Sequence, residues 1–157
     1  MQVKPVYLTA EGKTKIEEEL HYLRCVRRKE AEERIKIARE AADAVGNPEF
    51  DEAKDELGFV DGRIRSLEAM LANAVLIDPN HNDAHGVVHI GSEVVLTNED
   101  GEEETYTIVG KAEANPKLGR ISNESPIGRA LLDRRAGDEI EIAVPDGNLR
   151  LRIVKTT

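Results

Sequence analysis

The 157-residue chain is acidic and poor in aromatic residues: its formal net charge is −9, 34% of its residues are charged and 3% are aromatic. This composition excludes one thick core but suffices for a thin helix-on-helix seam and a small sheet domain. It also argues against a general binder of nucleic-acid phosphates, because such proteins are usually basic. The acid is spread evenly, with 13 basic and 17 acidic side chains in residues 1–78 (net −4) and a net −5 in the remainder.

The sequence predicts a cytoplasmic protein without a membrane segment. The first eight residues lack the apolar run of a signal peptide, and no window is apolar for long enough to span a bilayer. Cys25 is the only cysteine, so no internal disulfide can form. Because it falls within a helical pattern, we expect a buried or half-buried structural thiol.

A first long helix is predicted to begin near Thr9, whose side chain can cap the first turn. Apolar residues then recur at helical spacing, with an irregular step between Val26 and Ala31 that predicts a local change of pitch. The apolar positions are Ile16, Leu20, Leu23, Val26, Ala31, Ile35, Ala38 and Ala42.

A second long helix carries an uninterrupted apolar heptad. Its start is marked by Asn47 as a cap, Pro48 at the first helical position and Glu49 in the first turn. The heptad positions are Phe50, Ala53, Leu57, Val60, Ile64, Leu67, Leu71 and Ala74.

Only residues 43–46 separate the two stripes, so we expect an antiparallel helical hairpin with its tip at about 43–47. The polar outer face of the second helix leaves no further seam, which favours a monomer. The alternative is one arm of a bundle completed by dimerisation, although a bundle helix needs a wider apolar face.

After a linker at Asp78–Gly86, strand patterns dominate. Ser125-Pro126 predicts a short helix that ends at Leu131-Leu132. The fold class is therefore α+β with two domains, a coiled-coil hairpin over 1–78 and a small antiparallel sheet domain with one short helix over 79–157. The expected strands are Val87–Ile90, Glu93–Thr97, Thr105–Val109, Glu139–Val144 and Asn148–Val154, with a turn at Asn98–Gly101.

The sequence predicts neither a metal site nor an enzyme pocket. His81, His85 and His89 are spaced like metal ligands on a helix, but the Pro, Asn and Gly residues among them oppose a helix. We expect solvated linker histidines. No phosphate-binding Gly-rich loop and no specific Ser/His/Asp arrangement is present.

The hairpin tip is the remaining candidate site. A carboxylate at the end of a long probe can complete the coordination of a weakly held Mg²⁺ inside a partner's active site. Arg39 and Lys54 flank the tip on the two arms and could offset RNA phosphate charge.

Motifs along essentially the whole chain resemble the bacterial Gre transcript-cleavage factors. The second domain supplies two long stretches, residues 105–110 (TYTIVG) and 121–131 (ISNESPIGRAL). The first domain supplies PVYLT (5–9), EEEL (17–20), ARE (38–40), EAK (52–54), GF (58–59), GRI (62–64) and NAVLID (73–78).

The resemblance implies a coiled coil that enters the secondary channel of bacterial RNA polymerase, and an FKBP-like second domain, without isomerase activity, that docks on the channel rim. Such a factor is not an enzyme alone. It stimulates the polymerase to cut the 3′ segment of backtracked RNA. It needs no cofactor of its own and uses the Mg²⁺ of the polymerase active site, and its partners are the polymerase and the 3′ end of nascent RNA.

Transferred by position, the resemblance assigns roles to eight residues. Asp43 would assist the Mg²⁺, with Glu49 as a further candidate. Three residues would face RNA or polymerase: Arg39, Asn47 and Lys54. Three would dock on the rim: Ser125, Pro126 and Ile127.

The tip itself departs from the family pattern. The family reads Asp-Leu-x-Glu-Asn-Ala-Glu-Tyr, and here Gly46 replaces the second acid, Ala44 the Leu and Phe50 the Tyr. We therefore expect polymerase binding to survive and cleavage stimulation to be weakened.

Three alternatives remain open from the sequence. The first is a paralogue that occupies the channel without promoting cleavage and so inhibits or retunes transcription. The second is a dimeric coiled-coil adaptor. The third, a peptidyl-prolyl isomerase, is disfavoured because Tyr106 is the only aromatic residue of the second domain.

Overall fold

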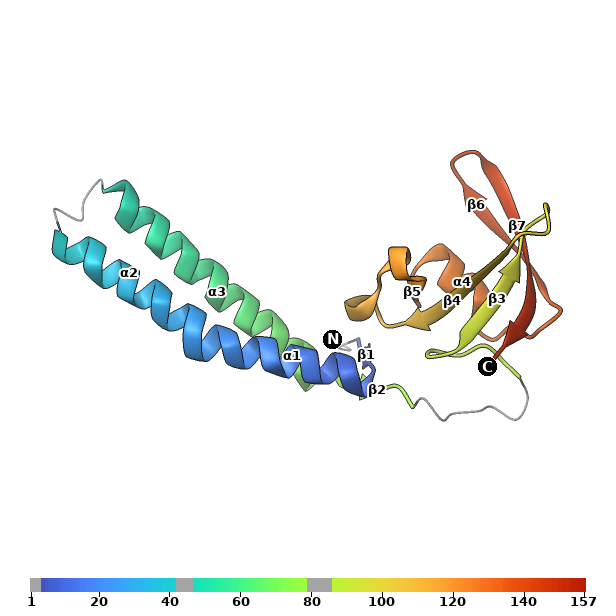
Figure 1. The fold of residues 1–157 in the computed structure, drawn as a ribbon, viewed down its shortest axis with the longest axis horizontal. Coiled ribbons are helices and arrows are strands. Elements are labelled where there is room, and N and C mark those ends of the chain that lie inside the picture. The colour runs from blue at the N-terminus through green and yellow to red at the C-terminus, as the bar shows by residue number, and fades with distance from the viewer. Residues whose placement is uncertain (1–3, 42–46, 79–85) are drawn as a thin grey trace. The chain divides into compact units, whose positions relative to one another are not determined.

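A computed structural model describes residues 4–41, 47–78 and 86–157 (Figure 1). It divides into two compact units: one combines the chain up to Gly12 with Ala74–Thr157, and the other is Lys13–Asn73. No helix within the described ranges is long and apolar enough to cross a membrane.

The Lys13–Asn73 unit is a helical hairpin. Its first arm consists of α1 (Ala10–Tyr22), whose first three residues belong to the other unit, the π-helical turn η1 (Leu23–Arg27) and α2 (Arg28–Ala41). Its second arm is α3 (Pro48–Ala72), which lies antiparallel beside the first arm (Figure 1). The predicted hairpin is confirmed.

The seam between the arms follows the apolar heptad of α3. Ala53, Val60, Ile64 and Leu67 are buried, and Leu20 of α1 packs with the last three. On α2, the buried seam residues are Ala31 and Ala38, whose small side chains let the helices approach closely. The last heptad residue, Ala74, lies beyond the end of α3, in a short strand.

The irregular step in the first stripe corresponds to η1. The amide of Arg28 bonds to the carbonyl of Leu23, five residues back, so this turn holds one residue more than an α-helical turn. The extra residue rotates the positions that follow. The seam then continues at Ala31, Ile35 and Ala38. Within the turn, Arg27 is half-buried four residues after Leu23, and Val26, which was predicted in the seam, is 39% exposed.

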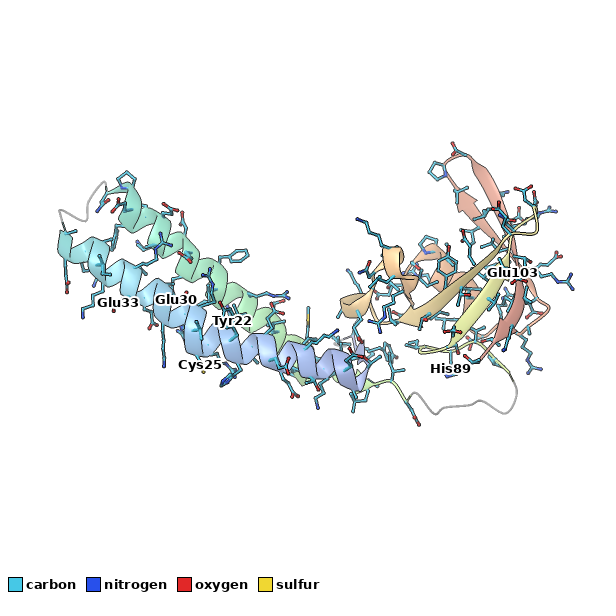
Figure 2. The ribbon with its side chains drawn as sticks, in the orientation of Figure 1. Tyr22, Cys25, Glu30, Glu33, His89 and Glu103 are labelled. Carbon is cyan, nitrogen blue, oxygen red and sulfur yellow. The ribbon has the colours of Figure 1, made fainter. Side chains whose placement is uncertain are left out.

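The prediction of a buried or half-buried Cys25 is wrong: it is exposed, because it follows the seam residue Leu23 by two positions, about half a helical turn. Its Sγ lies 3.7 Å from Nδ1 of His21, one helical turn earlier. Figure 2 shows Cys25 on the side of the first arm that faces away from α3.

The second unit contains a five-stranded sheet in the order β5-β4-β3-β7-β6. The pairs β4–β3, β3–β7 and β7–β6 are antiparallel, as predicted, and β5 adds a short parallel pair at one edge. The strands are β3 (Glu93–Thr97), β4 (Glu103–Val109), β5 (Arg120–Ser122), β6 (Glu139–Val144) and β7 (Gly147–Thr156).

Local turn chemistry explains why most of these strands could be predicted. The β3–β4 turn is held by Asn98, whose Oδ1 accepts from the amides of Asp100 and Glu102, and Gly101 supplies a φ of 81°. The predicted strand Val87–Ile90 is wrong. Within it only Val87 forms a bridge, to Arg135, because a tight turn follows at His89–Ser92.

Helix α4 (Pro126–Leu131) covers one face of this sheet and closes its core. Leu131 is fully buried, and Ile127 packs against the core. Two 3₁₀ turns, η2 (Lys111–Glu113) and η3 (Pro116–Leu118), connect β4 to β5. The buried core consists of Val88, Val94, Leu96, Ile108, Ile121, Leu131, Ile140, Ile142, Leu151 and Ile153.

A parallel strand pair not expected from the sequence belongs to the same unit. Strand β1 (Val6–Leu8) pairs with β2 (Ala74–Leu76), so the segment entering α1 lies beside the segment leaving α3. A Cβ on Gly110 would lie 2.0 Å from the carbonyl oxygen of Tyr7, which shows how closely β1 approaches the end of β4.

Candidate functional site

The start of α3 is built as the sequence predicts. The Asn47 side chain accepts a hydrogen bond of 3.0 Å from the amide of Glu49, and Pro48 occupies the first helical position. This contact satisfies one of the amides that a helix start leaves unpaired. Asn47 is thus used as a cap, and its half-buried side chain fixes where the second arm begins.

Phe50 brings together the two predicted basic residues at the described end of the hairpin. The guanidinium carbon of Arg39 lies 5.8 Å from the centroid of the Phe50 ring, and Nζ of Lys54 lies 5.3 Å from it. A cation over an aromatic face is attracted by the negative electrostatic potential that the quadrupole of the ring creates there. Phe50 therefore holds a cation from each arm in one place.

These two cations are exposed, and in the described part of the chain neither forms an ion pair with a carboxylate. Arginines further along the hairpin do form such pairs across the seam. These pairs are Arg24–Glu68, Arg27–Glu56 (3.0 Å), Arg28–Asp61 (3.1 Å), Arg34–Glu56 and Arg63–Glu19 (2.9 Å). Arg39 and Lys54 are thus able to attract an external anion.

Glu49 does not join this pair. Lys54 follows it by five positions, which places the two about 140° apart around α3. Accordingly, Glu49 lines a groove with Arg34 and Ala38, whereas Lys54 and Arg39 line another groove. The predicted Asp43 and the replacement at Gly46 lie outside the described residues.

From the sequence, Phe50 was predicted as a seam residue and noted as a replacement for the family Tyr, not as a contact of the two cations. Its role in gathering the cations could have been noticed from its spacing, because Lys54 follows it by four residues and shares its helix face. The approach of Arg39 from the other arm depends on the register of the hairpin and has no local signal.

The predicted docking residues lie at the start of α4. The Ser125 hydroxyl accepts from the amide of Gly128 at 3.0 Å and donates to the carbonyl of Ser122 at 2.7 Å. Ile127 is half-buried against the core, and Pro126 is exposed. Of the three, Pro126 therefore offers the most free surface.

A carboxylate from η2 caps the first turn of α1. Glu113 accepts hydrogen bonds from the Thr9 amide (2.7 Å) and the Thr9 hydroxyl (2.6 Å), and Thr9 in turn accepts from the amide of Gly12 (3.0 Å). The predicted helix start at Thr9 is confirmed. The contribution of Glu113, 104 residues away, was not foreseen.

His89 takes part in a local turn. Its Nδ1 lies 2.8 Å from the hydroxyl of Ser92, which is buried, and 3.2 Å from the carbonyl of Val87. His81 and His85, the other members of the predicted linker trio, lie outside the described residues.

Two hydrogen bonds to carboxylates shift pKa values. The Tyr106 hydroxyl donates to Glu104, and this bond, with burial and the carboxylate charge, raises the pKa of Tyr106 to about 12. In the hairpin, the hydrogen bond to Glu19 raises the pKa of Arg63, which is fully charged at neutral pH.

Comparison with known proteins identifies the class to which a narrow hairpin followed by this small sheet belongs. Residues 6–76 match the family model described as "Transcription elongation factor, N-terminal", and residues 83–157 match "Transcription elongation factor, GreA/GreB, C-term". Together the two matches cover most of the chain.

Individual relatives agree with these matches. The chain is 50% identical to transcription elongation factor GreA of Oceanobacillus iheyensis over 151 residues, which cover 96% of this chain and 95% of the relative. It is 52% identical to GreA of Geobacillus kaustophilus over 148 residues, 94% of this chain and 93% of the relative. A crystal structure of GreA factor homolog 1 (Gfh1) of Thermus thermophilus is 31% identical, covers 98% of this chain and 99% of its own, and has a TM-score of 0.46.

The chain belongs to the GreA/GreB family of transcription elongation factors.

Proposed function

We propose that this chain binds RNA polymerase, inserts its hairpin into the secondary channel and stimulates the polymerase's own transcript cleavage in backtracked complexes. The observation that carries the proposal is the pair of exposed cations, Arg39 and Lys54, over the Phe50 ring at the described end of the hairpin, neither of which pairs with a carboxylate among the described residues. Family membership supports the same activity. The chain is then a stimulating factor and not an enzyme by itself.

The hairpin end can contribute to cleavage in two ways. Arg39 and Lys54 would offset the phosphate charge of the extruded RNA 3′ segment and position it. Asp43 would supply a carboxylate oxygen to a weakly held Mg²⁺ of the polymerase, with Glu49 as the further candidate. Because Glu49 lies on the other side of α3 from Lys54, a role for it would require the ion and the RNA phosphates to occupy different sides of the hairpin.

The sheet unit would dock on the rim of the channel through the start of α4. The Ser125 cap and the packing of Ile127 hold the exposed Pro126 on a rigid helix start, which suits a docking contact. Gly128 adds to this rigidity, since a Cβ there would lie 2.0 Å from the carbonyl oxygen of Ser122. We propose a cytoplasmic monomer as the active form, which light scattering would verify.

The test is a transcript-cleavage assay on a stalled, backtracked complex, with wild type beside Gly46→Glu and Asp43→Asn and with polymerase binding measured separately. We expect all three to bind. Gly46→Glu should cleave faster than wild type because it restores a second carboxylate, and Asp43→Asn should approach the intrinsic rate. Each 1.4 kcal/mol or so of transition-state stabilisation corresponds to about tenfold in rate.

The outcomes distinguish a factor that stimulates cleavage from one that only occupies the channel. Wild-type binding without cleavage above the intrinsic rate would replace the proposal by a factor that occupies the channel and retunes transcription. No binding to polymerase at all would reject both readings.

A further inference from the structure

His21, near the end of α1, and Cys25, in η1, form a pair on the outer side of the first arm. Both side chains are exposed, and Sγ of Cys25 lies 3.7 Å from Nδ1 of His21. Figure 2 shows Cys25 on the side of this arm that faces away from α3, so the seam does not use it. Neither residue belongs to the site described above.

The separation of these two atoms matches that of two ligands on one zinc ion. Tetrahedral Zn²⁺ lies about 2.3 Å from a cysteine sulfur and about 2.0–2.1 Å from a histidine nitrogen, which places the two ligand atoms about 3.6 Å apart. Residues four positions apart are neighbours on a helix surface, so the backbone already holds both ligands at this spacing. Thiolate and imidazole favour Zn²⁺ over Mg²⁺ and Ca²⁺, which prefer oxygen ligands.

The pair supplies only two of the four ligands of a structural zinc site. In the ranges that the structure describes, no three His, Cys, Asp or Glu side chains are grouped so that they could hold a metal ion. A second pair from a second copy of the chain would give the closed set of two cysteines and two histidines.

The charges on either side of the pair are self-complementary. Glu18 lies three residues before His21, and Lys29 lies four residues after Cys25, and both are exposed. When two copies meet antiparallel about a two-fold axis through the ion, Glu18 of each copy lies near Lys29 of the other. Opposite charges therefore favour this arrangement of the two arms.

We propose that Zn²⁺ binds between the first arms of two copies of this chain, held by Nδ1 of His21 and Sγ of Cys25 from each copy. Each thiol loses its proton to the solvent and each imidazole binds in its neutral form, so one Zn²⁺ and two thiolates give a site without net charge. The zinc-free chain remains the monomer proposed above. The zinc site goes beyond the proposed function and does not depend on it.

The test adds Zn²⁺ to the reduced, metal-free full chain and follows its mass by light scattering. The mass should double once half an equivalent of Zn²⁺ per chain has been added, and EDTA should restore the monomer. Co²⁺ serves as a second probe, because a thiolate bound to Co²⁺ gives a charge-transfer absorption. Cys25→Ser and His21→Gln should each lower the Zn²⁺ affinity by more than the roughly 10- to 100-fold that loss of an outer-sphere partner costs. Both side chains are exposed, so both variants should fold.

Two further variants serve as controls. The double variant His81→Gln, His85→Gln removes two of the four histidines of the chain and should bind Zn²⁺ and dimerise like wild type. Glu18→Lys should weaken the dimer roughly two- to fivefold for each ion pair lost, and Glu18→Lys combined with Lys29→Glu should restore it.

Several results would overturn the inference while leaving the proposed function intact. Zinc binding without a change of mass would mean that one copy holds the ion with water. Zinc-dependent dimerisation of Cys25→Ser, or its loss in the His81 and His85 variant, would assign the ion to other ligands. A dimer that forms without metal and is removed by reductant would be a disulfide between two copies of Cys25. An unchanged dimer in Glu18→Lys would contradict the antiparallel arrangement.

Discussion

The middle of the hairpin and its described end use positive side chains in opposite ways. In the middle, arginines of the first arm face acids of α3, as in Arg28–Asp61 and Arg27–Glu56. At the end, Arg39 of the first arm and Lys54 of α3 both lie over the ring of Phe50. Cations that are neutralised by the other arm fix how the arms align, whereas Arg39 and Lys54, which pair with no carboxylate in the described ranges, remain available to a partner.

The ion pairs between the two arms matter more together than one by one. Single exposed ion pairs contribute only about 0–1 kcal/mol each. Glu56 differs from the others because its side chain is only 20% exposed and it accepts from both Arg27 and Arg34. Since Arg27 occupies a seam position, this carboxylate compensates a partly buried charge and specifies the register of the two arms.

The largest effect is expected at the end of the hairpin. Replacing both Arg39 and Lys54 by Ala should reduce transcript cleavage and affinity for backtracked complexes roughly 10- to 100-fold, because charged hydrogen bonds to RNA phosphate are lost. The melting temperature should stay within a degree or two of wild type, since both side chains are exposed. A comparable loss of affinity for polymerase without RNA would show that these cations contact the enzyme instead.

Glu56→Gln, in the middle of the hairpin, should instead reduce stability. Loss of the shared carboxylate should lower the free energy of unfolding by about 1–2 kcal/mol, because Arg27 in the seam loses the shorter of its two carboxylate contacts. Urea unfolding measures this. Glu30→Gln is the control, because Glu30 is more exposed and contacts Arg27 only at 3.6 Å within one arm. Equal losses of stability for the two substitutions would show that Glu56 is no more important to the hairpin than an exposed carboxylate.

Asn47→Ala should have a moderate effect on stability. It removes the cap whose Oδ1 accepts from the Glu49 amide, at a cost of about 1 kcal/mol of stability, and Asn47→Asp should restore most of it. Thermal unfolding followed by circular dichroism measures both variants. If Asn47→Ala instead reduces RNA-dependent affinity without a loss of stability, the residue contacts a partner and is not mainly a cap.

The smallest effect is expected for Phe50. Phe50→Leu keeps an apolar seam residue but removes the aromatic face, which should lower affinity for backtracked complexes roughly two- to fivefold. Phe50→Tyr retains the ring and should bind like wild type. If leucine and tyrosine behave alike, the ring only packs in the seam and does not position the cations.

The sequence predicted those parts of the site that depend on local order. The heptad of α3 and the Asn47-Pro48 start are set by residues within one or two turns of each other, so the periodicity and the cap chemistry sufficed. Strands β3 and β6 were predicted with the bounds they have, because alternating residues are flanked by turn-forming sequences.

The tertiary structure decided the features that depend on distant residues or on one-residue shifts. In the first arm the seam passes through Arg27 and not through Val26, and Cys25 is exposed, since packing against α3 selects which face is buried. The Glu113 cap on Thr9 and the pairing of Val6 with Ala74 join segments with no local signal for each other. Likewise, Arg39 and Lys54 could be predicted as basic residues of the tip, but only the alignment of the two arms brings both onto Phe50.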